Sequence, residues 1–173
     1  MTNEYATVFL NEGSKSYIDA LAAVKAFEKA VCGACKGVYD KYKPQLVNTI
    51  GVKDAHCDDY AINTEPENRF AELGVRQDSP SKRETLDIYL MWDDTEDGTS
   101  AITACVSLGF STRAERNEYA RLLRNIPSLE SGDDPWPYLC SSKRLSDISS
   151  CAETLGELVS EWLACWPAGH KLK

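Results

Sequence analysis

Cys32 and Cys35 have the Cys-x-x-Cys spacing that redox motifs and zinc sites share. A redox pair needs the amino end of a helix, which lowers the pKa of a thiol. A zinc site needs four ligands, and His56 and Cys57 could complete a Cys3His set. The pair instead falls inside a long predicted helix, and the adjacent residues His56 and Cys57 would rarely converge on one ion. We therefore interpret these cysteines as buried packing residues and predict no metal and no cofactor.

Nucleophilic catalysis has little support in the sequence. A cysteine nucleophile needs a histidine within hydrogen-bonding distance, and the chain has only His56 and His170. His170 lies in the terminal tail, and His56 in an acidic segment beside Cys57. The sequence contains neither of the glycine-rich motifs that bind phosphate groups, GxGxxG and GxxxxGK(S/T). We predict no catalytic residue, and a divalent-metal-dependent hydrolase using the acids of residues 51–78 is kept as an alternative.

A dense acidic cluster lies in the segment MWDDTEDGTS, residues 91–100. Its acids are Asp93, Asp94, Glu96 and Asp97. The spacing from Asp93 to Gly98 resembles the start of an EF-hand loop, but the twelfth position, which needs a glutamate, is Ala104 in an apolar strand. Calcium binding is therefore not expected, and the segment is predicted to be a hairpin turn.

The pairing of that hairpin follows from its apolar residues. A three-residue loop, 96–98, pairs Trp92 with Ile102 and Leu90 with Ala104, and gathers the large apolar residues on one face. It also places Gly98 where a G1 bulge needs a left-handed residue. Geometry explains the glycine but not four acids, because a turn needs at most one of them.

Basic and aromatic residues provide two further candidate surfaces. Four arginines of a predicted helix fall within about 140° of arc at 100° per residue: Arg113, Arg116, Arg121 and Arg124. They form a weak candidate anion site, although a solvated face with Glu115 and Glu118 is the favoured interpretation. In the loop GDDPWPYL, Trp136 and Tyr138 are candidate interface anchors, with a plug over the core as the alternative.

A long helix is the first predicted element. Ser16 and Asp19 resemble a capping box, and Pro44 is expected to end the helix. Apolar residues recur between them at three- and four-residue steps: Tyr17, Leu21, Val24, Phe27, Val31, Cys35, Val38 and Tyr42. Gly33 and Gly37 would allow a bend or the close approach of another element.

The later segments predict strands and then helices. Residues 45–52 are a plausible strand, 58–63 and 69–76 are weaker ones, and 84–92 and 100–110 alternate clearly. A helix over 111–127 opens with a Thr112–Glu115 capping box, residues 128–140 read as a loop, and a last helix spans 145–166. We predict one α+β domain over 1–173: an antiparallel sheet of about four or five strands, with its central hairpin at 84–110, covered by the long helix and two carboxyl-terminal helices.

Charge and composition limit the kind of partner. The 173 residues carry a net charge of −8, and residues 51–100, with 13 acids and 5 bases, account for all of it. Such a surface repels nucleic acids and membranes and attracts basic proteins. The odd number of seven cysteines and the lack of a signal sequence or an apolar span predict a cytoplasmic protein.

These observations favour a protein-binding module over an enzyme. We expect an inhibitor or regulator of the immunity, antitoxin or phage counter-defence type, which occupies a basic protein surface, with nucleic-acid mimicry as one specific form of this function. The expected contacts are Asp93, Asp94, Glu96, Asp97, Asp58, Asp59, Trp136 and Tyr138. A secretion-type chaperone and a homodimeric structural subunit are further alternatives.

Overall fold

The computed structural model describes residues 4–63, 70–78, 84–94, 100–133 and 136–172, with side chains for 12–53, 84–91, 102–133 and 136–172. The chain begins with a long helix, α1 (Glu4–Gln45), which continues into a π-helical turn, η1 (Leu46–Ile50). Four strands follow: β1 (Asp54–Asn63), β2 (Phe70–Asp78), β3 (Glu84–Asp94) and β4 (Ser100–Phe110). The remaining elements are α2 (Arg113–Leu122), β5 (Leu129–Gly132), β6 (Tyr138–Arg144), the 3₁₀ turn η2 (Ile148–Ser150) and α3 (Cys151–Cys165).

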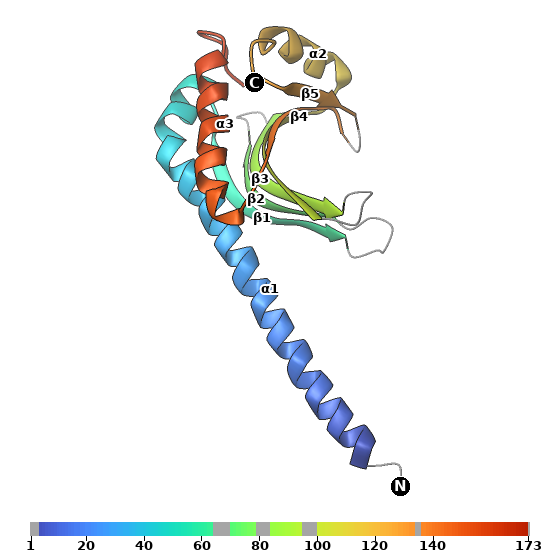
Figure 1. Cartoon of the computed structure of the whole chain (residues 1–173). Coiled ribbons are helices and arrows are strands. Elements are labelled where there is room, and N and C mark those ends of the chain that lie inside the picture. The colour runs from blue at the N-terminus through green and yellow to red at the C-terminus, as the bar shows by residue number, and fades with distance from the viewer. Residues whose placement is uncertain (1–3, 64–69, 79–83, 95–99, 134–135, 173) are drawn as a thin grey trace.

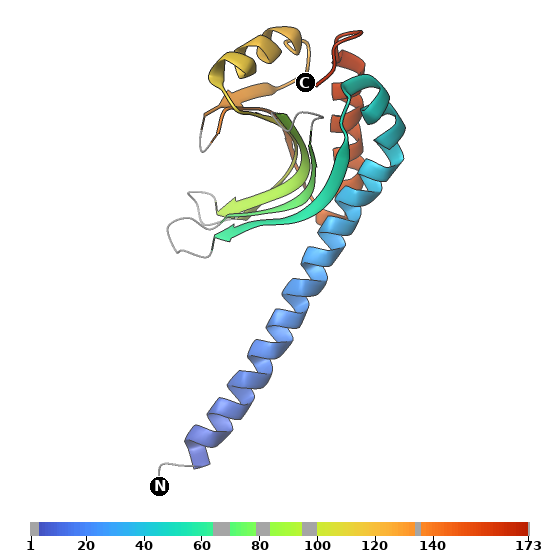
Figure 2. The same cartoon turned by 180° about the vertical axis from the view of Figure 1, so that it is seen from behind.

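The strands form one antiparallel sheet in the order β1-β2-β3-β4-β6-β5. The sheet is strongly curved, and α1 and α3 lie against its convex face (Figures 1 and 2). α2 packs at one end of the sheet near β5 and does not cover that face (Figure 1). The predicted α+β class is therefore confirmed, with six strands instead of four or five and with one of the two carboxyl-terminal helices displaced to the end.

The central hairpin has the predicted boundaries and register. β3 and β4 pair Trp92 with Ile102 and Leu90 with Ala104, as the three-residue loop requires. This register buries Leu90 and Ala104 on the face that α1 and α3 cover. Residues 95–99, which include Gly98 and the proposed bulge, lie outside the described residues.

α1 is longer than predicted at both ends. It already includes Ser16, so the Ser16–Asp19 capping box does not start it, and it passes through Pro44. The predicted strand over 45–52 is wrong, because Leu46 and Ile50 continue the buried helical face and are fully buried. The helix ends at Gly51, which has a φ of 90° and donates its N–H to the Leu46 carbonyl at 2.9 Å.

The carboxyl-terminal third also differs from its prediction. Thr112 and Glu115 form the predicted capping box, with Thr112 N to Glu115 Oε2 at 3.0 Å, but α2 ends at Leu122. Residues 129–132 and 138–144, within and after the predicted loop, form β5 and β6. Leu145 donates its N–H to Ile102 and so extends the sheet, and α3 begins only at Cys151.

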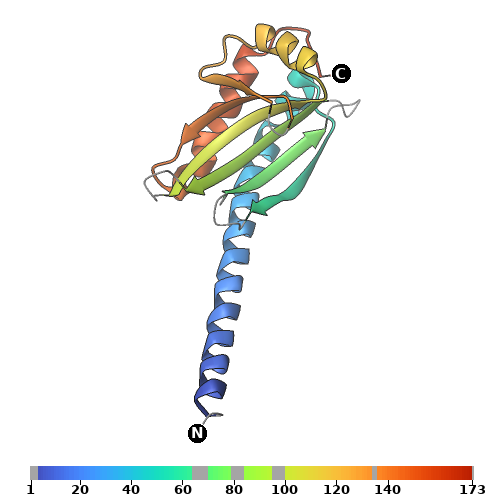
Figure 3. The ribbon, with the colours of Figure 1, turned by 90° about the vertical axis from the view of Figure 1, so that its right-hand side faces the viewer.

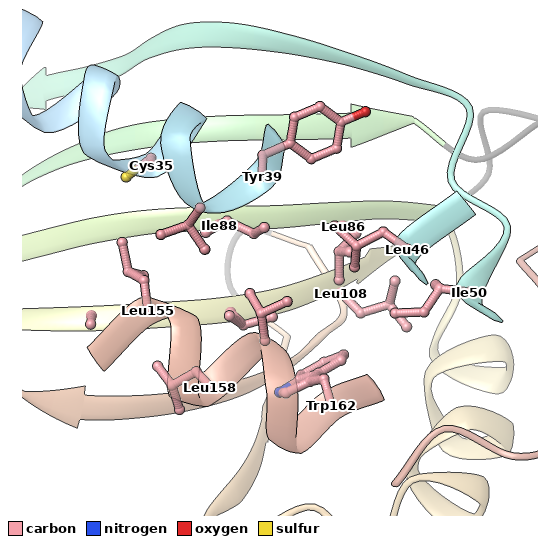
Figure 4. Close-up of a cluster of buried hydrophobic side chains, with 14 of the residues drawn as sticks. Cys35, Tyr39, Leu46, Ile50, Leu86, Ile88, Leu108, Leu155, Leu158 and Trp162 are labelled. Carbon is pink, nitrogen blue, oxygen red and sulfur yellow. The ribbon is translucent and has the colours of Figure 1, made fainter. Parts of the chain in front are cut away.

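The core lies between the convex face and its two helices (Figure 4). The sheet contributes Leu86, Ile88 and Leu108, and α3 contributes Leu155, Leu158 and Trp162. Trp162 is fully buried and donates its indole N–H to Ser141 Oγ at 2.8 Å, which satisfies both polar groups.

Candidate protein-binding surface

The amino-terminal part of α1 extends away from the sheet and from α3 (Figures 1 and 3). Large apolar side chains are exposed along it, and we call them the protruding stripe: Tyr17, Ile18, Leu21, Val24 and Phe27. Val24 is 47 % exposed, whereas Val31, seven residues later, is 2 % exposed. One face of one helix is therefore part core and part surface.

The acidic cluster lies at the far end of the hairpin from α2. Asp93 and Asp94 end β3, and Asp93 pairs with Ala101. Glu96 and Asp97 lie outside the described residues. The backbone thus places the first two acids at the tip of the β3–β4 pair, as the hairpin prediction required.

Asp58 and Asp59 lie in the middle of β1, which is an edge strand. β1 includes the weaker predicted strand over 58–63 and starts four residues earlier. Asp59 pairs with Leu73, and Leu73 with Leu90, three positions from Asp93 in β3. At roughly 3.3 Å per residue and 4.8 Å per strand, the backbones of Asp59 and Asp93 are about 14 Å apart. The two acidic pairs are neighbours on the sheet and not one cluster.

Trp136 is the most exposed large apolar side chain among the described residues, at 71 %. It therefore does not plug the core. It lies two residues before Tyr138, which pairs with Gly109, while Asp93 pairs with Ala101 in the same strand β4. Eight residues separate the two positions, or about 27 Å. A partner that touched both Trp136 and the hairpin tip would have to span the length of the sheet.

Tyr138 is partly buried and has a packing role. It lies opposite Gly132 in the β5–β6 pair, and its ring occupies the space that a β-carbon at Gly132 would fill. An aromatic ring that covers a cross-strand glycine stabilises an edge of a sheet. Of the two predicted aromatic anchors, only Trp136 is therefore free to meet a partner with most of its surface.

The four candidate arginines do not form one site. Arg113 and Arg116 both bind Asp133, at 3.3 and 3.1 Å, and Arg116 also donates to the Gly132 carbonyl at 3.2 Å. These contacts tie α2 to the end of β5. Arg121 and Arg124 are exposed, and Arg124 follows the end of the helix. The carboxylate of Asp133 thus already occupies half of the predicted anion site.

The cysteine pair lies deep within α1 and far from either helix end. Cys35 is fully buried and Cys32 partly so. The side chains of His56 and Cys57, in β1, are outside the described set. Among the described side chains, no group of three or more histidines, cysteines or carboxylates could hold a metal ion.

A buried polar cluster joins the start of β3 to α2 and to the tail after α3. The Tyr119 hydroxyl donates to Glu84 Oε1 at 3.5 Å, and the His170 ring packs edge-on against Tyr119 at 5.1 Å. Burial raises the pKa of Tyr119 well above its ordinary value, and the charge of Glu84 adds to this shift. The hydroxyl therefore stays protonated as a donor, and the cluster stabilises the end of the sheet.

The sequence predicted the apolar face of α1 but not its exposure. Periodicity identifies a face without identifying what covers it. A sheet strand of 11 residues spans roughly 36 Å, whereas a helix of 42 residues spans roughly 63 Å. A helix so much longer than the strands cannot pack against the sheet along its whole length, and this difference in length could have predicted that α1 extends beyond the domain. The observed helix is also longer than the predicted 16–43.

Comparisons with family models, curated proteins and solved structures found no match to this chain. Within the described ranges, no helix combines the length and the apolar character needed to cross a membrane.

Proposed function

We propose that the protein is a protein-binding module that inhibits or regulates another macromolecule, and that the protruding stripe is its main contact surface. The exposure of the stripe carries this proposal. A row of large apolar side chains on a rigid element is typical of an interaction site, because few monomers leave such a patch in water. Val24 and Leu21 lie at its centre and are the expected source of affinity.

The negative charge of residues 51–100 has a different role in this proposal. It raises the association rate with a basic partner, such as a nucleic-acid-binding protein, and orients the encounter. Asp93 and Asp94 at the hairpin tip and Asp58 and Asp59 in β1 are the acids to which we assign this role. In a specific version of this proposal, nucleic-acid mimicry, the carboxylates occupy the sites on the partner that phosphates of a nucleic acid would occupy.

Affinity capture with cross-linking in the source cells tests which surface binds. We expect the tagged wild-type chain to retain a partner that Val24→Asp loses and Trp136→Ala retains. Both substitutions change an exposed side chain, so that folding should survive in each, and circular dichroism checks this. If Val24→Asp keeps the partner and Trp136→Ala loses it, the contact surface lies around Trp136 and not on the protruding stripe.

The steering role is tested on the captured partner by its association rate at rising salt. We expect the rate constant to fall at least about tenfold between low and high salt, and the dissociation rate to change little. Asp93→Asn with Asp94→Asn should lower only the association rate. A rate independent of salt would remove the acidic surface from the mechanism.

A further inference from the structure

A regular spacing continues through both parts of α1. Steps of four and three residues alternate through Tyr17, Leu21, Val24, Glu28, Val31, Cys35 and Val38. Such a pattern over three heptads, apolar at every step except Glu28, is typical of the seam of a helix–helix contact. The domain buries the seam from Val31 onward, and the seam from Tyr17 to Val24 is exposed. A seam of this spacing suits contact with another helix, as the buried part of α1 contacts α3.

One flank of the exposed seam is basic. Lys15, Lys25 and Lys29 fall within about 80° of arc beside Leu21, at 100° per residue, and the exposed Ile18 lies among them. All three are exposed, and within the described part of the chain none of them forms an ion pair. By contrast, Lys36, farther along the same flank, binds Asp40 at 2.7 Å.

Resting on the proposed function, we infer that the protruding stripe binds an amphipathic helix of another protein whose seam is flanked by acidic residues. The apolar seam from Tyr17 to Val24 supplies the buried contact, and Lys25 and Lys29 pair with carboxylates on the bound helix. Charged residues beside a seam select the partner and its orientation.

A second copy of this chain fits the seam poorly. In a parallel pair, Glu28 in the seam would face Glu28 of the copy. In an antiparallel pair, the two-fold axis would turn each lysine flank toward the lysine flank of the copy. Either arrangement places like charges together, whereas an acidic helix neutralises the lysines.

An anionic membrane surface also fits poorly. Residues 12–30 contain three acids and three bases, and the whole chain has a net charge of −8. Helices that lie on anionic membranes carry a strong excess of lysine and arginine on their polar face. A protein helix needs only the local lysine flank, which is present.

Two synthetic helical peptides test this inference on the full chain. They share one apolar seam and differ in having glutamate or lysine at every flanking position. We expect fluorescence anisotropy to show the acidic peptide binding at least about tenfold more tightly than the basic one at low salt, with the difference shrinking at high salt. Lys25→Glu with Lys29→Glu should reverse the preference. The matched control is Arg121→Glu with Arg124→Glu, which makes the same charge change at the end of α2 and just after it, and should leave the preference unchanged.

Three outcomes would overturn the inference. The first is equal affinity for the two peptides at low salt. The second is a dimer in sedimentation analysis that Val24→Asp dissolves, and the third is binding to phosphatidylserine vesicles that Val24→Asp abolishes. If cellular capture still depends on Val24 while the peptides bind equally, the proposed function stands and only the acidic helix is wrong. If capture does not depend on Val24, the proposed function itself is wrong.

Discussion

Val24 and Val31 are the same residue type on one face of α1, one heptad apart, and they differ in what surrounds them. Val31 packs in the core with Cys35 and the sheet, whereas Val24 is exposed on the same helix. Apolar spacing along a helix therefore specifies a contact but not whether the same chain provides it. The buried half of α1 contributes to stability, and the exposed half is available for function.

The largest expected effect is on stability in the buried half. Val31→Asp places a carboxylate in a site that is 2 % exposed, and should lower the free energy of unfolding by about 3 kcal/mol or more. Val24→Asp makes the same change on the exposed half, and should alter it by no more than about 0.5 kcal/mol. Urea denaturation of both variants measures the difference. Similar losses would mean that the two halves are equally buried in solution.

The next effect concerns α3, which covers the buried half. Ser141→Ala removes the acceptor of the Trp162 indole N–H and leaves that donor buried and unpaired. The free energy of unfolding should fall by about 1–3 kcal/mol. Ser142→Ala, the neighbouring position in β6, is the matched control and should change it by less than about 0.5 kcal/mol. Equal effects would show that the Trp162 hydrogen bond does not hold α3 in place.

A titration of stability with pH also distinguishes the domain from the protruding half. Burial raises the pKa of Tyr119, so the unfolded chain loses this proton first, above about pH 10. The stabilisation from protonated Tyr119 is complete below that pH and is lost as the pH rises, by up to about 1 kcal/mol at pH 11. Tyr119→Phe should remove this part of the pH dependence, and Val24→Asp should leave it unchanged. A wild-type curve that stays flat from pH 9 to 11 would contradict the assignment.

Local patterns predicted the elements whose contacts lie close in sequence. The β3–β4 register follows from alternating residues around a short turn, and the α2 capping box from Thr112 and Glu115. Contacts distant in sequence decided the rest. Residues 46–50 read as a strand, but burial of Leu46 and Ile50 against the sheet keeps them helical beyond Pro44. β6 forms because it pairs with the free edge of β4, and β5 then pairs with β6. The sequence of 128–140 alone gives no information about this distant pairing.

The candidate surface shows the same difference between features set by nearby residues and features set by contacts distant in sequence. Exposure of Trp136 was an open alternative in the sequence, because a loop aromatic either covers the core or faces solvent. The arginine arc assumed a helix to 127, and only the fold brings Asp133 to Arg113 and Arg116. The apolar face of α1 was visible from spacing alone, whereas the place at which it leaves the domain depends on where the sheet ends.

The smallest effect tests the back of α1. Gly33 and Gly37 were expected to allow a bend or the close approach of another element, but a β-carbon at either position would meet no atom within 4 Å. Gly33→Ala and Gly37→Ala should therefore each raise the free energy of unfolding by about 0.5–1 kcal/mol through helix propensity. Gly132→Ala is the contrast, because its β-carbon would overlap the Tyr138 ring and should destabilise the chain.

Measured together with affinity capture, these alanines separate folding from binding. If the partner contacts only the protruding stripe, both variants should gain stability and keep the partner. A gain in stability with loss of the partner would show that the bound protein also packs over Gly33 and Gly37, on the back of the helix. A loss of stability in either variant would show that part of this chain already covers that side of α1.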